Sequence, residues 1–329
     1  MYEPEPKTPD ITPELRTVET GTAFRGGPIR LGSLHHRLLR KRYATGYFPN
    51  MNTRHERAAR PDADDYDLVV VGGGASGLAA AVFAARYGLD TVVFDRGGSA
   101  IRRSYSIENY LGFLAVDPAT FLRLGRAHAR YEGAEVVDDL VTSVVERDDG
   151  FRVRTEDGTD VGARYVVAAS AYNADYLTEL DGGAFHDEGE HPVECDEATG
   201  RTPVDGLYVA GWLSGQPHQV LIAAGHGARV AKSLVHDRRR ERGYWDGIAD
   251  YWDWSVETGT YSGEQWHDRL DEWVDSTLPD DHDVSDERIE RIREAVKEER
   301  LSFECTPAER EARMEDTRRL LAEQFGSAE

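Results

Sequence analysis

Three glycines with a fixed spacing carry the clearest chemical signal in this sequence. A strand-like run, residues 67–71, leads directly into residues 72–77 (GGGASG), and an alanine-rich segment follows. This order is typical of a buried strand, a tight turn and a helix N-terminus. Gly72 permits the sharp turn, Gly74 the close approach of a pyrophosphate, and Gly77 the close packing of helix on strand. The unpaired N–H groups at the helix start can bind phosphate, so the pattern predicts a dinucleotide site.

A carboxylate at the end of the next strand supports this interpretation. The apolar run Thr91–Phe94 ends at Asp95, and Gly88 marks the end of the helix before it. Asp95 is therefore placed to accept hydrogen bonds from ribose hydroxyls. A glycine triplet alone is a weak signal, because many glycine turns are only structural. Here the strand, the helix and the acidic strand end agree, which favours binding.

The charge of the chain is the second signal. The formal net charge is −22, from 61 acidic and 39 basic residues. Such a chain repels itself in dilute buffer, whereas at ~1 M salt the Debye length of ~3 Å screens the repulsion. We therefore expect a halophilic, archaeal source with a salty cell interior. A basic partner is the alternative, but the acidic residues are spread over the whole sequence.

Other features of composition exclude several classes of protein. No apolar run approaches the ~18 residues of a membrane span, and no apolar stretch at the N-terminus suggests a signal peptide. We expect a cytoplasmic protein that does not enter a membrane. The cysteines, Cys195 and Cys305, are too few and too far apart for a disulfide framework or a CxxC site, and we expect no metal site.

The chain divides into three predicted parts. Residues 1–64 form an extension whose second half is basic, residues 65–236 form an α/β domain, and residues 237–329 form a helical extension. The basic segment is interpreted as an arm on an acidic body. A nucleic-acid tail is the alternative, but no recognition motif accompanies the charge, so no nucleic acid is expected.

The middle part predicts an α/β fold. We expect a Rossmann-like domain with a central parallel sheet, a small β-meander and a C-terminal α-helical appendage. Asp117 and Pro118 begin a helix that runs to Glu132. Later segments are three strand-like runs separated by Asp-Gly turns, one short buried strand and a small-residue helix, at Glu135–Glu146, Phe151–Thr155, Ala163–Ala168, Gly206–Gly211 and Val220–Val235.

The last ninety or so residues show helical signals. Capping boxes are predicted at Ser262–Gln265 and Thr306–Glu309, and Ser285 can cap a third helix. Apolar residues recur at helical spacing, and their tryptophans are interpreted as core packing more than as a stacking box. These residues are Trp245, Ile248, Trp252, Trp266, Leu270, Trp273, Ile289, Ile292 and Val296.

Three blocks of this sequence resemble the FAD domain of the thioredoxin reductase family. They are residues 69–81 (VVVGGGASGLAAA), residues 106–113 (SIENYLGF), and residues 200–212 with 219–231 (GRTPVDGLYVAGW and QVLIAAGHGARVA). The resemblance covers about residues 66–236, roughly half the chain, and implies FAD as the cofactor. The middle block is the most specific of the three.

The resemblance also implies roles for single residues. The glycine block would hold the FAD pyrophosphate, Asp95 the adenosine ribose, and Asn109 would lie by the flavin ring. The amides of Gln219 and Val220 would stabilise negative charge at N1 and O2 of a reduced flavin. The predicted cofactor-binding residues are Gly72, Gly74, Ala75, Ser76, Gly77, Asp95, Arg96, Asn109, Gly211, Trp212, Gln219 and Val220.

Three departures from the family pattern limit what the resemblance implies. Only residues 171–205 stand where the family inserts an NADPH-binding domain, which is below the ~50 residues of a small domain. The redox-active CxxC is absent from the sequence, and Cys195 is read as an inert residue. Trp212 replaces the aspartate that binds the flavin ribityl or phosphate, and His226 replaces another acidic position.

The leading hypothesis is an FAD-dependent oxidoreductase that receives electrons from a redox partner protein or from a transiently bound reductant and passes them to an unknown acceptor, which could also be a partner protein. His218, beside Gln219, is a weak catalytic candidate for proton delivery, with a hydrogen-bonded structural role as its alternative. Tyr110, Arg102 and Arg103 are further candidates for lining the flavin ring or attracting an anionic acceptor.

The second hypothesis is a flavin-binding regulatory or interaction module without turnover, and thioredoxin reduction by a borrowed thiol is a minor third. Whether the chain is an enzyme stays open, as does its oligomeric state, with a homodimer among the options.

Overall fold

The computed structural model describes residues 65–180, 193–250, 256–259 and 261–326. These residues all belong to one compact unit. The predicted basic extension and Trp252 lie outside the described residues. The division of the chain into three parts therefore stays a prediction.

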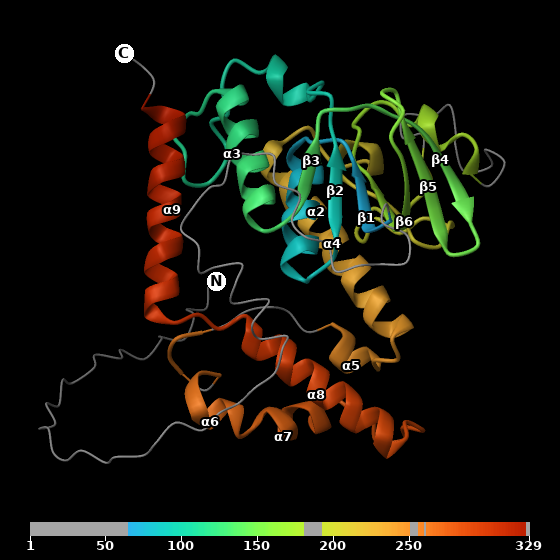
Figure 1. Cartoon of the computed structure of the whole chain (residues 1–329), viewed down its shortest axis with the longest axis vertical. Helices are drawn as coiled ribbons and strands as arrows, with labels where there is room; N and C mark the ends of the chain where they lie inside the picture. Colours follow the sequence, from blue (N-terminus) through green and yellow to red (C-terminus); the bar gives the residue numbers. More distant parts are fainter. Residues whose placement is uncertain (1–64, 181–192, 251–255, 260, 327–329) are drawn as a thin grey trace, which may run out of the picture. The chain divides into compact units, whose positions relative to one another are not determined.

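A parallel sheet forms the centre of the described structure (Figure 1). Its strands are joined in the order β3-β2-β1-β6, and β7 pairs with β6. Val70 of β1 lies opposite Val93 on one side and Val167 on the other, so the apolar runs of the sequence are aligned. This confirms the predicted Rossmann-like α/β fold. The strands are β1 (Tyr66–Val71), β2 (Thr91–Phe94), β3 (Glu135–Val137), β6 (Asp160–Ala168) and β7 (Leu207–Val209).

A small antiparallel meander extends from β6. β4 (Val141–Arg147) pairs with β5 (Gly150–Thr155), which pairs with the first half of β6. The single run expected at Glu135–Glu146 is wrong, because it contains both β3 and β4. Asp139 breaks it. Its buried carboxylate accepts hydrogen bonds from the backbone N–H groups of Leu140 at 2.7 Å and Asp157 at 3.3 Å, which turns the chain out of the parallel sheet.

Alternate residues of β1 face two apolar cores. Leu68 and Val70 pack with α2 (Ala75–Arg86) and α4 (Val220–Glu241), whereas Val69 and Val71 pack on the other face with residues of the meander. This alternation is the period-two pattern of a strand buried on both faces. α3 (Pro118–Tyr131) packs against α2. The helix expected at Val220–Val235 continues to Glu241, so the predicted domain boundary after residue 236 falls inside α4.

The C-terminal helices have an apolar core of their own. This core consists of Trp245, Ile248, Val274, Ile289, Ile292 and Val296. The helical spacing predicts all of these except Val274, and the predicted Trp273 packs against the core. Buried Arg239 of α4 joins it to the α/β domain by donating to the Ala249 carbonyl at 3.1 Å and to Glu299 at 2.6 Å. The helices are α5 (Asp246–Ala249), α6 (Gly263–His267), α7 (Leu270–Ser276), α8 (Asp286–Ser302) and α9 (Pro307–Phe325).

Most predicted helix caps are present. Thr306 and Glu309 form a capping box, and the Ser285 and Asp117 side chains cap α8 and α3. The capping box expected at Ser262–Gln265 is wrong. The Ser262 hydroxyl donates instead to the Gly259 carbonyl at 2.9 Å, and this local bond competes with the helix cap.

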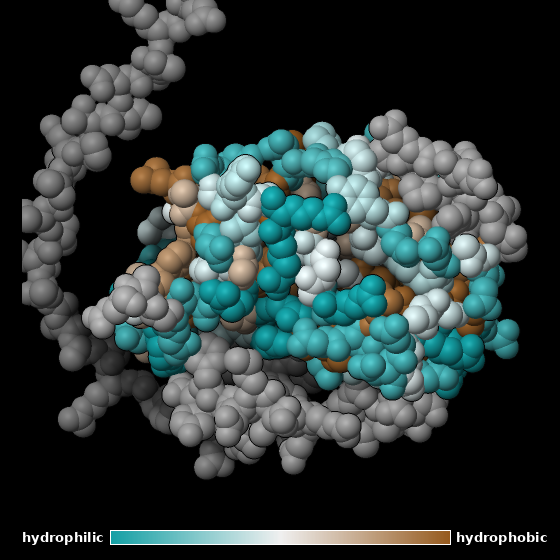
Figure 2. Space-filling view, turned by 90° about the horizontal axis from the view of Figure 1, so that it is seen from above, coloured by the Kyte–Doolittle hydropathy of each residue, from teal (hydrophilic) through white to brown (hydrophobic). Residues whose placement is uncertain are grey.

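The surface reflects the charged composition. Seen from above Figure 1, the described residues are largely hydrophilic, with separate apolar patches between them (Figure 2). Short 3₁₀ turns connect the main elements at Ala100–Arg103 (η1), Asp175–Leu177 (η2) and Gly211–Ser214 (η4). Within the described ranges, none of the helices has the length and apolar character needed to cross a membrane.

Candidate functional site

The glycine turn after β1 is fixed by close backbone contacts. Gly72 has a φ of +107°, and an added Cβ there would lie 2.5 Å from the Ala169 carbonyl oxygen. An added Cβ at Gly77 would overlap the Gly72 carbonyl oxygen and press on Val70. These two glycines are therefore required by the fold itself, the first for the sharp turn and the second for the packing of α2 on β1.

Gly74 is different, because nothing in the fold requires it. Its φ is −80°, which any residue adopts, and an added Cβ would have only the Ser99 hydroxyl within 4 Å, at 3.5 Å. Gly74 begins α2 without a side-chain cap, and Ala75 and Ser76 follow as its first residues. The first turn holds no acidic residue. This combination leaves backbone N–H donors and open space, the features an anion requires.

Asp95 lies beside this turn, as predicted. Its Oδ1 accepts from the Gly97 N–H at 3.0 Å, and its Oδ2 lies 3.3 Å from Arg126 Nη2 on α3. An added Cβ at Gly73 would collide with the Asp95 carboxylate. Arg96 is exposed and faces Glu156 at 3.5 Å. Arg126 is not predicted from the sequence, since one arginine on a helix is not distinctive until its neighbour is known.

The middle and late blocks meet at one hydrogen bond. Asn109 Nδ2 donates to Gln219 Oε1, although 110 positions separate the two residues. Gln219 is the N-cap residue of α4, its side chain makes no capping bond, and Val220 begins the helix. The first turn of α4, like that of α2, holds no acidic residue. Two residues that were selected from separate motifs are thus brought together at a second uncapped helix start.

Small residues hold the two uncapped helices together. An added Cβ at Gly211 would lie 2.5 Å from the Ser76 hydroxyl, and one at Gly227 would overlap the Ser76 carbonyl oxygen. Buried His226 Nδ1 accepts from the Gly211 N–H at 3.0 Å. Burial lowers the pKa of His226, so the ring stays neutral and able to accept this bond. The late block therefore packs directly on the first turn of α2.

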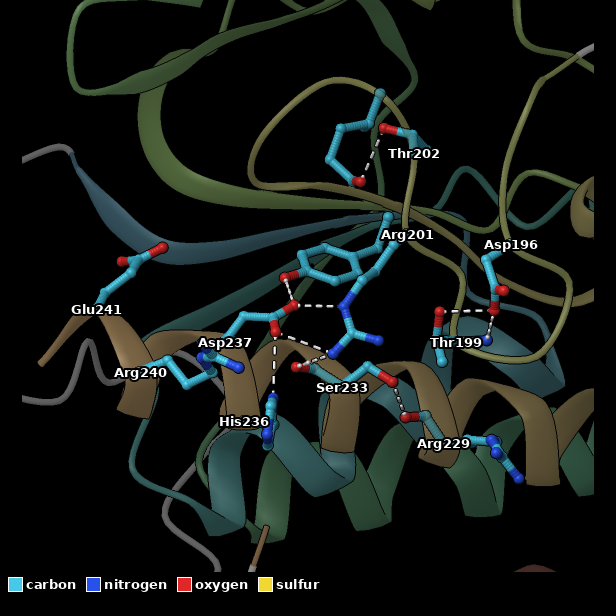
Figure 3. Close-up of polar contacts among 12 residues, drawn as sticks. Asp196, Thr199, Arg201, Thr202, Arg229, Ser233, His236, Asp237, Arg240 and Glu241 are labelled. Carbon is cyan, nitrogen blue, oxygen red and sulfur yellow. Dashed lines mark hydrogen bonds and ion pairs between the residues drawn. The ribbon is translucent and has the colours of Figure 1, made fainter. Parts of the chain in front are cut away.

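A polar cluster anchors the other half of α4 to the sheet (Figure 3). Asp237 accepts from Arg201 at 2.7 and 2.9 Å and from the Tyr208 hydroxyl at 2.8 Å. Burial alone would raise the pKa of Asp237, but the hydrogen bonds from Arg201 and Tyr208 outweigh it and hold the pKa below its ordinary value. Burial and the charge of Asp237 raise the pKa of Tyr208. The cluster fixes α4 relative to β7, and the sequence did not reveal it.

Three aromatic rings gather beside Gln219. Trp212 and His218 lie with ring centroids 3.5 Å apart, and Tyr172 lies 6.0 Å from Trp212 and 5.7 Å from His218. The Tyr172 hydroxyl is 3.3 Å from His218 Nδ1. Sequence reasoning selected Trp212 and His218 but missed Tyr172, which follows the end of β6. We call Tyr172, Trp212 and His218 the aromatic cluster.

Other predicted candidates lie apart from these contacts or lack a reactive environment. Burial, followed by the charges of Glu197 and Asp196, raises the pKa of the Cys195 thiol to about 11. A thiol with that pKa is not a nucleophile at neutral pH, which agrees with the inert reading. Arg102 and Arg103 are exposed on η1, and the Tyr110 ring packs edge-on against Phe121. In the described part of the chain, no group of His, Cys, Asp and Glu side chains is arranged to hold a metal.

The parallel sheet, the glycine turn and the acidic strand end define a Rossmann-type dinucleotide-binding protein. Residues 43–211 match the family model described as pyridine nucleotide-disulphide oxidoreductase. This match covers half of the sequence, and the chain belongs to that family. Among solved structures, a thioredoxin reductase from Gloeobacter violaceus has a TM-score of 0.50 at 17% identity, over 59% of this chain and 100% of that one. That likeness supports the fold.

Curated relatives match a shorter segment. The thioredoxin reductase of Treponema pallidum is 32% identical over 111 residues, which are 32% of this chain and 36% of that protein. The NADH dehydrogenase of Bacillus subtilis is 28% identical over 110 residues, 33% of this chain and 22% of that protein. The match therefore spans about a third of these relatives or less, and their activities are not transferred with it.

Proposed function

We propose that this chain is a flavoprotein oxidoreductase that holds FAD across the two uncapped helix starts. The observation that carries the proposal is the open position of Gly74 at the uncapped N-terminus of α2. The turn could accept a side chain there without strain, yet the space is kept free beside unpaired N–H donors. A pyrophosphate in that space would complete the hydrogen bonding of the helix start.

The neighbouring groups fit the rest of such a cofactor. Asp95 stands at the acidic strand end, where it would accept hydrogen bonds from the adenosine ribose. Asn109 and Gln219 would lie by the flavin ring, and the first N–H groups of α4 would stabilise negative charge at its pyrimidine edge. When bound, the flavin supplies the electron transfer, so the protein has to provide orientation and electrostatics.

Trp212 would pack an apolar ring against the cofactor in place of the family's aspartate. Its indole is half-buried on η4, next to Gly211, which contacts Ser76 of the first block. This contact supports a position of Trp212 near the first turn of α2. The cofactor would then lose a polar contact and gain an aromatic one.

The electron donor and acceptor are proposed to differ from those of thioredoxin reductases. Residues 171–205 are too few for a second nucleotide domain, and the Cys195 thiol is held protonated. We therefore expect no NADPH-dependent reduction of thioredoxin. A separate protein or a diffusible molecule would exchange electrons with the flavin.

The visible spectrum of the full chain, purified in molar salt, tests the proposal. We expect yellow protein that releases FAD on heating and is bleached anaerobically by NADH, NADPH or reduced ferredoxin. Colourless protein that binds no added FAD with micromolar affinity would contradict FAD binding. Bound FAD that none of these reductants bleaches would favour the alternative, a flavin-binding module without turnover. That alternative is supported by the absence of a CxxC from the sequence and by the shortness of residues 171–205, where the family has its nucleotide domain.

A further inference from the structure

The aromatic cluster lies in a part of the chain that is unusual for its lack of charge. Residues 206–228 and 165–174 contain no Asp, Glu, Lys or Arg, although 30% of the whole sequence is charged. The first segment holds Trp212 and His218, and the second holds Tyr172. Much of both segments is buried, and their exposed residues around the cluster, which include Tyr172, His218 and Leu221, offer an apolar or hydrogen-bonding surface without a Lys or Arg side chain for a phosphate.

Backbone strain brings Tyr172 into the cluster. Ala171 has a φ of +65°, and it is the only residue other than glycine with a positive φ in the described part of the chain. A left-handed alanine costs about 1 kcal/mol, and residues held in such conformations are concentrated at functional sites. The strained residue turns the chain at the end of β6, so that the Tyr172 hydroxyl reaches His218 Nδ1 at 3.3 Å.

The cluster is accessible and adjoins the place proposed for the flavin ring. Tyr172 is 53% exposed and His218 is exposed. Gln219 follows His218 directly and binds Asn109. Leu221 and Ile222, in the first turn of α4, are 39% and 43% exposed and add an apolar border. A flat apolar molecule could thus stack on the rings within reach of the flavin edge.

The geometry points to the aromatic cluster as the binding site of an uncharged planar electron acceptor of the quinone class, with His218 as its proton donor. The three rings supply stacking surfaces, and the uncharged side chains around them suit an apolar ligand. The imidazole can donate to a quinone carbonyl oxygen while Tyr172 holds its other nitrogen. This inference rests on the proposed function for its source of electrons, but not for the binding site.

The reaction balances with these participants. A quinone takes up two electrons and two protons to become a hydroquinone. When bound, the reduced flavin of the proposed function would supply the electron pair and one proton and would itself be oxidised. His218 would donate the second proton from a ring nitrogen and would recover a proton from water.

Binding of menadione to the full-length protein, measured by calorimetry in molar salt, tests the site without turnover. We expect Tyr172→Ala or Trp212→Leu to raise the Kd about tenfold, the loss expected for one stacked pair. Tyr261→Ala is the matched control. Tyr261 is 57% exposed and also lies against a tryptophan, with its centroid 5.0 Å from that of Trp266, and its loss should leave the Kd unchanged.

The proton-donor role needs a separate measurement. In stopped-flow mixing of photoreduced protein with saturating menadione, His218→Gln should slow hydroquinone formation about a hundredfold, because glutamine can bind Tyr172 but cannot release a proton. An unchanged rate at saturation would overturn the role of His218.

The outcomes also separate this inference from the proposed function. Menadione binding that depends on Tyr172 in a protein that holds no FAD would support the site and reject the flavoprotein proposal. Bound FAD with no menadione binding, or with equal binding in Tyr172→Ala, would reject the site. Tighter binding of the anionic nicotinamide mononucleotide than of menadione would reject the quinone class.

Discussion

The five long helices of the described structure begin in two different ways, whereas the short helices α5, α6 and α7 all lack a side-chain cap. α3, α8 and α9 start at Asp117, Ser285 and Thr306, whose side chains accept hydrogen bonds from the first turn. α2 and α4 start at Gly74 and Gln219, which make no side-chain cap. A cap typically contributes about 1 kcal/mol, so its absence from both helices at the candidate site has a cost.

The presence or absence of a cap indicates the role of each helix start. The capped helices satisfy their first N–H groups from their own sequence, and they can stand at the surface without help. The uncapped helices are held by glycine contacts on Ser76 and, for α4, by the Asp237 cluster. Their first N–H groups are left for a ligand, and neither first turn carries an acidic residue that would repel a phosphate.

The largest expected effect separates two glycines of the same turn. Gly77→Ala should destabilise the protein by about 3 kcal/mol, because its Cβ would overlap the Gly72 carbonyl. Gly74→Val should leave the fold intact and abolish FAD binding, because its side chain fills only the open space. Thermal melting by circular dichroism and flavin absorbance measure the two effects. If the melting temperature of Gly74→Val falls as far as that of Gly77→Ala, or if Gly74→Val still binds FAD normally, the distinction between structural and ligand-facing glycines is wrong.

The second largest effect is the loss of stability when the Asp237 cluster, which anchors the uncapped helix α4, is disrupted. Asp237→Asn should cost about 2 kcal/mol, because buried Tyr208 and the Arg201 pair lose their carboxylate. Asp205→Asn is the control. Asp205 also binds an arginine, Arg164 at 3.0 Å, but its side chain is 86% exposed, so its loss should cost less than about 0.5 kcal/mol. Equal losses of unfolding free energy in the two variants, measured by urea unfolding, would mean that the cluster does not anchor α4.

The same aspartate gives a pH dependence. Because the pKa of Asp237 is lower in the folded protein than its ordinary value, its contribution is present above the unfolded-state pKa of about 3.9. That contribution is lost as the pH falls through the lower, folded-state pKa. The stability difference between wild type and Asp237→Asn should therefore shrink in acid and stay constant at neutral pH.

The smallest expected effect is the loss of a side-chain cap from one of the capped helices, α3. Asp117→Ala should lower the free energy of unfolding by about 1 kcal/mol, because Thr120 N–H loses its acceptor at 2.8 Å. Asp117→Asn should lose less, since asparagine also caps. Neither variant should change FAD affinity. A change in affinity as large as that of a site variant would show that α3 is coupled to the candidate site.

Local patterns were sufficient to predict the helix starts and the glycine turn. Their signals lie within four residues, as in Thr306 with Glu309 or Gly74 before α2. The end of α4 was predicted too early, at Val235, because no breaker stands there and the next glycine is Gly243, which has a φ of +90°. Ser262 fails as a cap because a competing acceptor, the Gly259 carbonyl, lies equally close in sequence.

Contacts between distant segments could not be predicted in this way. Arg126 beside Asp95 depends on how α3 is placed relative to β2. Tyr172 beside His218 and Arg201 beside Asp237 depend on how β6, β7 and α4 are placed, and neither partner's local sequence carries that information. Asn109 and Gln219 were selected only because a family resemblance supplied the long-range relation. The roles of the predicted cofactor-binding residues stay predictions.

Strand β6 has a consequence for how this chain folds. It pairs with β1, β5 and β7, so the parallel strands and the antiparallel meander share its backbone within one sheet. Tyr66 and Ala163 are neighbours in the register although nearly a hundred positions separate them. The loop between such partners must close before their pairing stabilises anything, and high contact order of this kind slows folding. The parallel sheet can therefore assemble only late, and the meander and the sheet lose their structure together when β6 detaches.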